Sequence, residues 1–343
     1  METNFLGIIS DILPADLKKF LLVIDEFTEK TPRVWQQLAT DLGGRYSPER
    51  LERLYVSLCD HMGEPRNTTT LSMRFLYEMP LSVEDFRGFP FMNLGYHPTP
   101  DGPPIQELEL TERDRKFQCN SALYRLWLKS SDITGKEVVE VGSGRGGGGS
   151  FLTRYFKPRS YTGVDGSRQQ VAHCTEAYAG HAHPGLRFAH GLATAIPLQD
   201  SSVDLVLNVE SSHCYSDLDK FFFEVHRVLR KGGTFVLTDI LYRKAQIFPY
   251  LNTLDRYFHV RGKTDITKNV LACLELHGPD QFLNYLEGMG GRVRTSQPTN
   301  RDLLMTSARV FLPMMDNAPF ANYRALSTSG EALYVSFRCE RKG

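Results

Sequence analysis

Glycines and acidic residues follow a short apolar run near the middle of the chain. The stretch VVEVGSGRGGGGSFL carries six glycines between Gly142 and Gly149. They directly follow a β-branched segment and directly precede the helical pattern SFLTRYF, which predicts a strand–turn–helix unit and argues against a flexible tether. A turn of this kind brings backbone N–H groups and a helix N-terminus up to a ligand. Glycine suits it because the missing Cβ permits close approach and positive φ.

Two carboxylates accompany this turn. Glu140 lies inside the strand, two residues before Gly142. A buried strand rarely keeps a carboxylate without a partner, so Glu140 serves either a ligand or a structural ion pair. Asp165 closes the next apolar segment, SYTGVD, at a position where a carboxylate can accept two hydrogen bonds from a ribose diol.

Polar side chains also end two later strands. Asn208, Glu210 and His213 lie at or just beyond the end of VDLVLNV, and Asp239 lies near the end of TFVLTDI. Because ligands of parallel sheets bind beyond the carboxyl ends of the strands, we expect these four side chains to face one crevice. Histidine, with an ordinary pKa of about 6.5, can take up a proton near neutral pH. Two alternatives stay open: His213 as a pocket wall or helix cap, and Asp239 as a strand-end cap.

The elements that position these residues alternate regularly. Apolar strands are predicted at EVVEV, SYTGVD, LRFAHG, VDLVLNV and TFVLTDI. Helices such as SRQQVAHCTEAYA and LDKFFFEVHRVLRKGG lie between them, the second expected to stop at Gly232–Gly233. This alternation predicts a doubly wound α/β domain with a parallel sheet covered on both faces. Residues 241–325 read as a largely helical insertion over the active site, before a terminal strand, EALYVSFRCER.

The first ninety residues form a separate part of the pattern. Apolar stripes in LPADLKKFLLVIDEF and YSPERLERLYVSLCDHM predict helices, the second starting from Ser47 and Pro48. We therefore expect a helical extension over residues 1–90 and the α/β domain over residues 91–343. A packing surface, lid support or oligomer contact are open roles for the extension. The Pro/Gly-rich passage FRGFPFMNLGYHPTPDGPP should be irregular.

Composition limits the function classes. Among 343 residues, 40 basic residues balance 40 acidic ones, so no overall field attracts nucleic acid or an anionic membrane. The sequence shows no signal peptide and no apolar stretch long enough to span a bilayer. The six cysteines form no CxxC pair, which favours reduced thiols in a cytoplasmic protein. His181 and His183 lack nearby ligands, so no metal site is expected.

The set of motifs as a whole resembles a known family. VVEVGSGRGGGGSFL, YTGVD and VDLVLNVESSHCYSDLDKFFFEVHRVLRKGGTFVLTDI are similar to the class I S-adenosylmethionine (SAM)-dependent methyltransferases. Within that class the chain looks most like the small-molecule enzymes of secondary metabolism, including phthiotriolone-type and sugar O-methyltransferases. FMNLGYHP, DITKNVL and YRALSTSGEALY extend the resemblance over residues 90–343. The resemblance implies a Rossmann-like seven-stranded sheet, a helical lid or insertion, and SAM as cofactor.

The resemblance also assigns residues to the cofactor. By it, the methionine end of SAM would lie on the glycine turn, and Asp165 would hold the ribose hydroxyls. The full set of implied cofactor residues is Tyr96, Glu140, Gly142, Ser143, Gly144, Gly146, Asp165, Gly166, Ser167, Leu192, Ala193 and Asn208. One departure concerns adenine: the family commonly has Gly-Asp-Ala where this chain has Gly191-Leu192-Ala193, so the carboxylate that would bind the adenine amine is missing.

The resemblance implies methyl transfer to a hydroxyl of a polyketide, lipid or glycosylated metabolite. His213 would act as general base and Asp239 would assist it. An alternative is a carbon or nitrogen acceptor, with Glu210 stabilising a cation. Nucleic-acid methylation is disfavoured because Val209-Glu210-Ser211-Ser212 replaces the Asn/Asp-Pro-Pro-aromatic motif. A non-catalytic partner protein and a homodimer formed through the N-terminal helices are further hypotheses.

Overall fold

The computed structural model describes residues 9, 12–24, 26–27, 29–62, 90–128, 130–178, 185–215, 217–242, 244–277 and 332–343. The chain divides into two compact units, which are described separately. The described part of the first unit holds three helices: α2 (Pro14–Ile24), α3 (Pro32–Asp41) and α4 (Pro48–Met62).

The helices of the first unit share their own apolar core. Phe20, Leu38 and Leu58, one from each helix, are fully buried in it. At the start of α4 the backbone N–H of Arg50 donates to the hydroxyl of Ser47, which confirms the predicted N-cap. Asp16 binds Arg45 and the hydroxyl of Tyr46, which joins α2 to the loop before α4.

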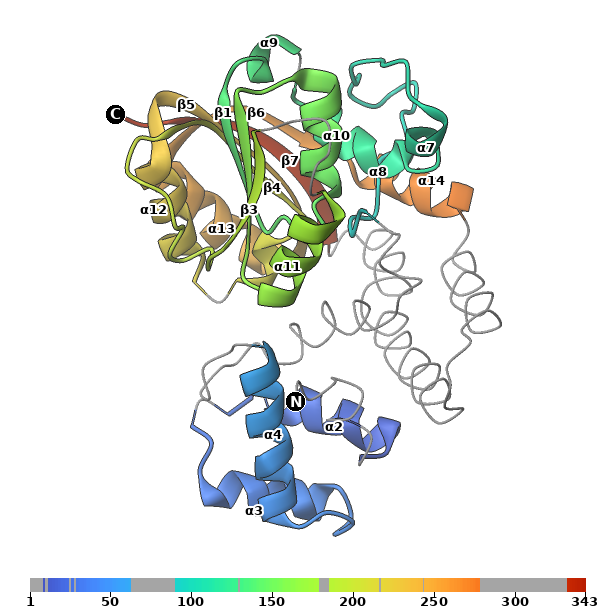
Figure 1. The fold of residues 1–343 in the computed structure, drawn as a ribbon, viewed down its shortest axis with the longest axis vertical. Coiled ribbons are helices and arrows are strands. Elements are labelled where there is room, and N and C mark those ends of the chain that lie inside the picture. Colours follow the sequence, from blue (N-terminus) through green and yellow to red (C-terminus); the bar gives the residue numbers. More distant parts are fainter. Residues whose placement is uncertain are drawn as a thin grey trace. The chain divides into compact units, whose positions relative to one another are not determined.

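The second unit is built on a seven-stranded sheet of order β3-β2-β1-β4-β5-β7-β6 (Figure 1). Its strands are β1 (Glu137–Val141), β2 (Ser160–Asp165), β3 (Leu186–His190), β4 (Val203–Val209), β5 (Leu229–Tyr242), β6 (Phe258–Asp265) and β7 (Ala332–Arg341). The first five pair in parallel, whereas β7 runs antiparallel to both β5 and β6. The predicted Rossmann-like α/β architecture is confirmed. The order reverses at β1, so the carboxyl ends of β1 and β4 border the crevice where such sheets bind ligands.

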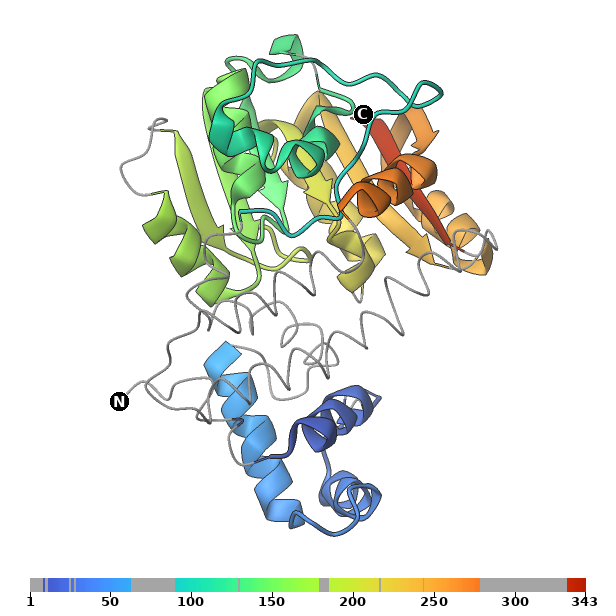
Figure 2. The same ribbon diagram turned by 90° about the vertical axis from the view of Figure 1, so that its right-hand side faces the viewer.

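Helices cover both faces of this sheet. Alternation along β4 sends Leu205 and Leu207 to one face and Val206 to the other. The first face packs against α8 and α10, with α14 over its β7 side (Figure 2), and the second packs against α12 and α13. The helices of this unit are α7 (Glu112–Arg115), α8 (Gln118–Arg125), α9 (Ser130–Ile133), α10 (Gly147–Phe156), α11 (Arg168–Ala177), the 3-10 turn η2 (Ser212–Cys214), α12 (Leu218–Val228), α13 (Lys244–Tyr257) and α14 (Thr267–His277).

One detail of the sequence prediction was wrong. The helix expected to stop at Gly232–Gly233 ends at Val228, because the chain begins to pair with β4 already at Leu229. Gly232, with φ of +73°, instead lies inside β5, where the pairing with β4 shifts register. The described part of the segment after Leu241 contains the helices α13 and α14, and strand β6 lies between them in the chain and at the sheet edge. The expectation of a largely helical insertion stays a prediction.

Other expectations concern features outside the α/β core. In the ranges that the structure describes, no helix is long and apolar enough to cross a membrane. None of the six cysteines, all of which are described, forms a disulfide. His181, His183 and most of the predicted insertion, residues 278–325, lie outside the described residues. The boundaries 1–90 and 91–343 stay a prediction.

Candidate active site

The glycine turn lies at the carboxyl end of β1 and leads directly into α10. Gly142 has φ of +75°, and its N–H donates to the carbonyl of Val164 at 2.8 Å. Gly146 caps the helix with φ of +72°, and a Cβ there would lie 2.7 Å from the Phe188 ring. The turn is therefore packed against β2 and β3. The expectation of a strand–turn–helix unit is confirmed.

Asp165, at the end of β2, holds this turn in place. Its Oδ2 accepts from the N–H of Gly144 at 2.8 Å, and its Oδ1 accepts from the N–H of Ser167 at 2.8 Å. The carboxylate thus ties the glycine turn to the start of α11. A carboxylate oxygen can accept more than one hydrogen bond, and the binding of a ribose diol at Asp165 stays a prediction.

Glu140 lies beneath the turn and is 1% exposed. Its two oxygens accept hydrogen bonds from the Tyr124 hydroxyl at 2.8 Å and the Tyr161 hydroxyl at 2.7 Å. No cationic side chain among the described residues pairs with it, so the ion pair considered as the structural alternative is not found there. Burial, aided by the charge of Asp165, raises the pKa of Glu140 to about 7.

The loops after β2 and β3 form the other side of the predicted cofactor site. The carbonyl of Gly166 contacts His190 Nε2 at 3.1 Å, and the Ser167 hydroxyl caps α11 by accepting from Gln170. Leu192 is 44% exposed and its carbonyl accepts from the N–H of Ala195, in the tight turn that contains Ala193.

The segment of residues 90–97 is fastened to several elements. Its Leu94 N–H donates to Glu210 Oε1 at 2.7 Å, and the Pro90 carbonyl accepts from the N–H of Gly147. Tyr96 is fully buried, and its hydroxyl donates to the carbonyl of Pro103 at 2.6 Å. Tyr96 therefore has a packing role in this structure, and its predicted contact with a methionine group stays a prediction.

His213 and Asp239 meet where β4 and β5 run side by side toward their carboxyl ends. His213 Nδ1 lies 2.6 Å from Asp239 Oδ1. Burial disfavours the imidazolium, but the adjacent Asp239 charge outweighs it and raises the pKa of His213 well above its usual value. Burial also disfavours the Asp239 anion, yet the charge and hydrogen bonds of His213 prevail and lower the pKa of Asp239. Both shifts favour the ionic form of the pair.

Glu210 lies between the pair and the 90–97 segment. It adopts φ of +50°, which is unusual for a residue with a Cβ, directly after β4. Burial raises the pKa of Glu210 to about 7, although its hydrogen bonds oppose this. Asn208, in β4, donates through Nδ2 to the carbonyl of Val141 at 2.8 Å and to the Tyr215 hydroxyl at 3.0 Å.

Two buried polar atoms at this edge of the sheet lack partners. Ser143 Oγ and Asn208 Oδ1 are both inaccessible, and neither has a hydrogen-bond partner within the described part of the chain. Buried polar groups are normally satisfied, so unpaired atoms next to a packed glycine turn favour a ligand. They fit a cofactor that presents a polar amino-acid end beside the turn.

Sequence reasoning missed the residues that support the charged groups. Tyr124 and Tyr161 hold Glu140, whereas Ser212 donates to Asp239 Oδ2 at 2.6 Å and lies 3.0 Å from the Tyr250 hydroxyl. Tyrosine hydroxyls inside apolar segments gave a weak signal, because a buried phenol needs a partner. Which partner it finds depends on elements distant in sequence.

Strand order, glycine turn and acidic strand ends together define a Rossmann-like methyltransferase fold. Residues 139–237 match the model of a methyltransferase domain. The resemblance of this part of the chain to SAM-dependent methyltransferases is thereby confirmed.

Two similar curated proteins are methyltransferases by name. A probable phthiotriol/phenolphthiotriol dimycocerosates methyltransferase 2 of Mycobacterium ulcerans is 42% identical over 150 residues, or 44% of this chain and 55% of the relative. A fatty-acid O-methyltransferase of Mycolicibacterium smegmatis is 42% identical over 43% of this chain and 52% of the relative. The chain thus spans about half the length of these curated relatives.

The structural comparison concerns the fold alone. Geranyl diphosphate C-methyltransferase from Streptomyces coelicolor, solved with S-adenosyl-L-homocysteine, superposes with a TM-score of 0.50 at 18% identity. The match covers 74% of this chain and 92% of that one. The prediction of SAM as the cofactor agrees with this bound product of the cofactor and with the matched domain.

Proposed function

We propose that the chain transfers a methyl group from SAM to a hydroxyl of a small lipid, polyketide or glycosylated metabolite, with His213 as general base. The observation that carries this proposal is the 2.6 Å contact of His213 Nδ1 with Asp239 Oδ1 at the ends of β4 and β5. The names of the two mycobacterial relatives, which refer to lipid substrates, support the acceptor class.

The cofactor would lie on the glycine turn. Gly142, Gly144 and Gly146 would contact its methionine end, Ser143 and Asn208 would supply polar partners, and Asp165 would accept from its ribose. Gly166, Ser167, Leu192 and Ala193 would border the adenosine. The bound cofactor supplies an electrophilic methyl group. The protein must align the acceptor oxygen with that group and remove its proton.

The Asp239 carboxylate fixes the ring of His213 and its tautomer. With Nδ1 directed at Asp239, proton uptake from a substrate falls to Nε2. Because the pKa of His213 is raised, the base form is populated only as the pH rises. Turnover of a hydroxyl acceptor should therefore increase with pH above 6.5.

The same ion pair supports a second candidate, methylation of a carboxylate. A carboxylate needs no base, and an imidazolium at His213 would attract it. The relative named fatty-acid O-methyltransferase gives this candidate a specific basis. The two candidates predict opposite pH dependences, because deprotonation of His213 activates a hydroxyl acceptor but weakens binding of a carboxylate.

Labelled SAM incubated with long-chain alcohols, phenols and fatty acids tests the proposal. We expect label in an ether product, and loss of that product in His213→Ala while SAM still binds. Label only in fatty-acid esters would replace the hydroxyl acceptor by a carboxylate. Full turnover of a hydroxyl acceptor by His213→Ala would remove the assigned base. Product analysis would also distinguish methylation of a carbon or nitrogen acceptor, with Glu210 beside it, from methylation of an oxygen. Dimerisation through the N-terminal helices stays a proposal.

A further inference from the structure

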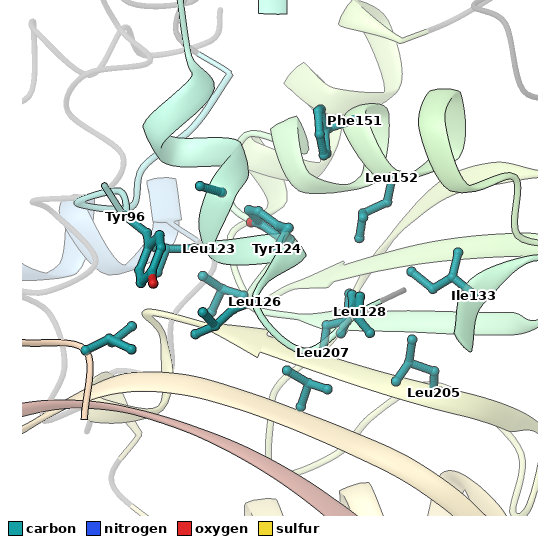
Figure 3. Packing of buried hydrophobic residues seen from close by; sticks show 14 of the residues in the cluster. Tyr96, Leu123, Tyr124, Leu126, Leu128, Ile133, Phe151, Leu152, Leu205 and Leu207 are labelled. Atoms are coloured by element: carbon teal, nitrogen blue, oxygen red, sulfur yellow. The ribbon is translucent and has the colours of Figure 1, made fainter. Parts of the chain in front are cut away.

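Two neighbouring elements reach the carboxyl group of Glu140, which projects from β1. Tyr124 reaches it from α8 and Tyr161 from β2, so that each carboxylate oxygen accepts one phenol hydrogen bond. Figure 3 shows Tyr124 among the buried apolar side chains of this face. The carboxyl is thus fixed in direction and isolated from water, yet it has no counter-charge among the described residues. A buried acid of this kind is costly unless a cation arrives beside it.

The second half of the glycine run makes room for the two phenol rings. A Cβ on Gly148 would overlap the ring of Tyr124, and a Cβ on Gly149 would lie 2.9 Å from Tyr161 Cε1. Both glycines lie inside α10, where each costs about 1 kcal/mol relative to alanine. The two glycines therefore lower the intrinsic stability of α10, and they leave the space in which the side chains that hold Glu140 lie.

The charge states of this cluster are defined by its surroundings. Burial and the Glu140 charge raise the pKa of Tyr124 and Tyr161 well above the usual value, so both phenols stay protonated and act as donors. Burial raises the pKa of Glu140 to about 7. The titratable groups facing this carboxyl from the surrounding elements are Tyr124 of α8, Tyr161 and Asp165 of β2, Cys174 of α11 and Tyr178 after α11. None of them supplies a positive charge.

We propose that Tyr124 and Tyr161 are positioning residues of the cofactor site, which hold the buried Glu140 carboxyl toward the cationic methionine end of SAM. This inference rests on the proposed function, because it requires SAM on the glycine turn that begins two residues after Glu140. The methionine end carries an ammonium and a sulfonium group. Either cation would supply a counter-charge to the Glu140 carboxylate.

Proton release follows from this arrangement. A cation beside Glu140 favours the carboxylate, so its pKa falls when the cofactor binds. A carboxyl that is partly protonated before binding then loses its proton. Release should approach about one proton per cofactor below pH 7 and vanish above about pH 8. The affinity for SAM should correspondingly fall by up to about tenfold for each pH unit below 7.

Calorimetric titration of SAM into the full chain measures both quantities. Titrations at pH 6 and pH 8.5 in buffers of different ionisation enthalpy give the number of protons released. We compare the wild type with Glu140→Gln, Tyr124→Phe and Tyr161→Phe, which remove a charge or one hydroxyl and keep the side-chain volume. Tyr155→Phe is the matched control, because the Tyr155 hydroxyl binds Asp114 and not Glu140.

The expected result is proton release at pH 6 in the wild type and in Tyr155→Phe, and none in Glu140→Gln. Each of the two other Tyr→Phe variants should bind SAM about tenfold more weakly at pH 7 while keeping its circular dichroism spectrum. This inference would be overturned if the wild type bound SAM without a proton release that depends on Glu140. It would also be overturned if Tyr124→Phe and Tyr161→Phe both kept the wild-type affinity. Either result would leave the proposed function intact. Absence of binding by the folded wild type would refute both.

Discussion

Replacement of Asp239 by Asn tests the ionic pair at the proposed catalytic centre. Asp239 is 1% exposed and accepts hydrogen bonds from the Ser212 hydroxyl, the His213 N–H, His213 Nδ1 and the Ile240 N–H. The amide of Asn keeps one acceptor oxygen but turns an NH₂ group toward existing donors. Removing one charge of a buried pair typically costs about 3–5 kcal/mol of unfolding free energy. We expect Asp239→Asn to lose an amount in this range near pH 6.

The pH dependence gives this prediction its specificity. The pKa of His213 is raised in the folded protein, so the stabilisation it contributes is full below its ordinary value of 6.5 and is lost as the pH rises through the folded pKa. The pKa of Asp239 is lowered from 3.8, so its contribution is full above 3.8 and is lost as the pH falls through the folded pKa. The difference between wild type and Asp239→Asn should therefore be largest between these two values and shrink at alkaline pH.

Urea unfolding at pH 6 and pH 9 measures that difference. Asp204→Asn is a matched control, because Asp204 is a partly exposed aspartate whose cationic partner, Arg230, does not titrate in this range. It should cost about 1 kcal/mol at both pH values. An equal loss of unfolding free energy for Asp239→Asn at both pH values would refute the ionic pair. A loss smaller than that of Asp204→Asn would refute the large cost expected for removing one charge of a buried pair.

Two further predictions concern the turn and the chemistry. Gly148→Ala should lower the free energy of unfolding in urea by about 1–3 kcal/mol, because its methyl overlaps the Tyr124 ring; an unchanged midpoint would show that the ring can move without cost. With saturating SAM, turnover of a hydroxyl acceptor should rise with pH above 6.5 and level off past the folded pKa of His213, as followed by release of the demethylated cofactor. Turnover that falls over this range contradicts a general base.

Sequence patterns predicted the elements that are buried on both faces. The strands β1, β2 and β4 match the apolar segments that precede Gly142, end at Asp165 and precede Glu210. Burial forces a continuous apolar pattern on such strands, and the pattern is legible without the fold. The convergence of His213 and Asp239 followed from the same rule, because both residues lie at the carboxyl ends of parallel strands.

Elements that are stabilised only by pairing with distant strands could not be predicted from the sequence. Strand β6 is mostly exposed after its buried first residue, Phe258, and its place in the sheet comes from backbone bonds to β7, far away in the sequence. The end of α12 at Val228 depends on a register with β4. The phenols of Tyr124 and Tyr161 were missed for a related reason: a hydroxyl's partner is a tertiary contact, and neither spacing nor composition specifies it.

Calorimetric titration of SAM into the wild type and into Asp165→Ala tests the central claim most directly. We expect one cofactor to bind per wild-type chain, and Asp165→Ala to bind at least about tenfold more weakly, because the ribose acceptor and the anchor of Gly144 are both lost. A folded wild-type chain that takes up no SAM, or an Asp165→Ala variant that binds it equally well, would contradict the placement of the cofactor on the glycine turn.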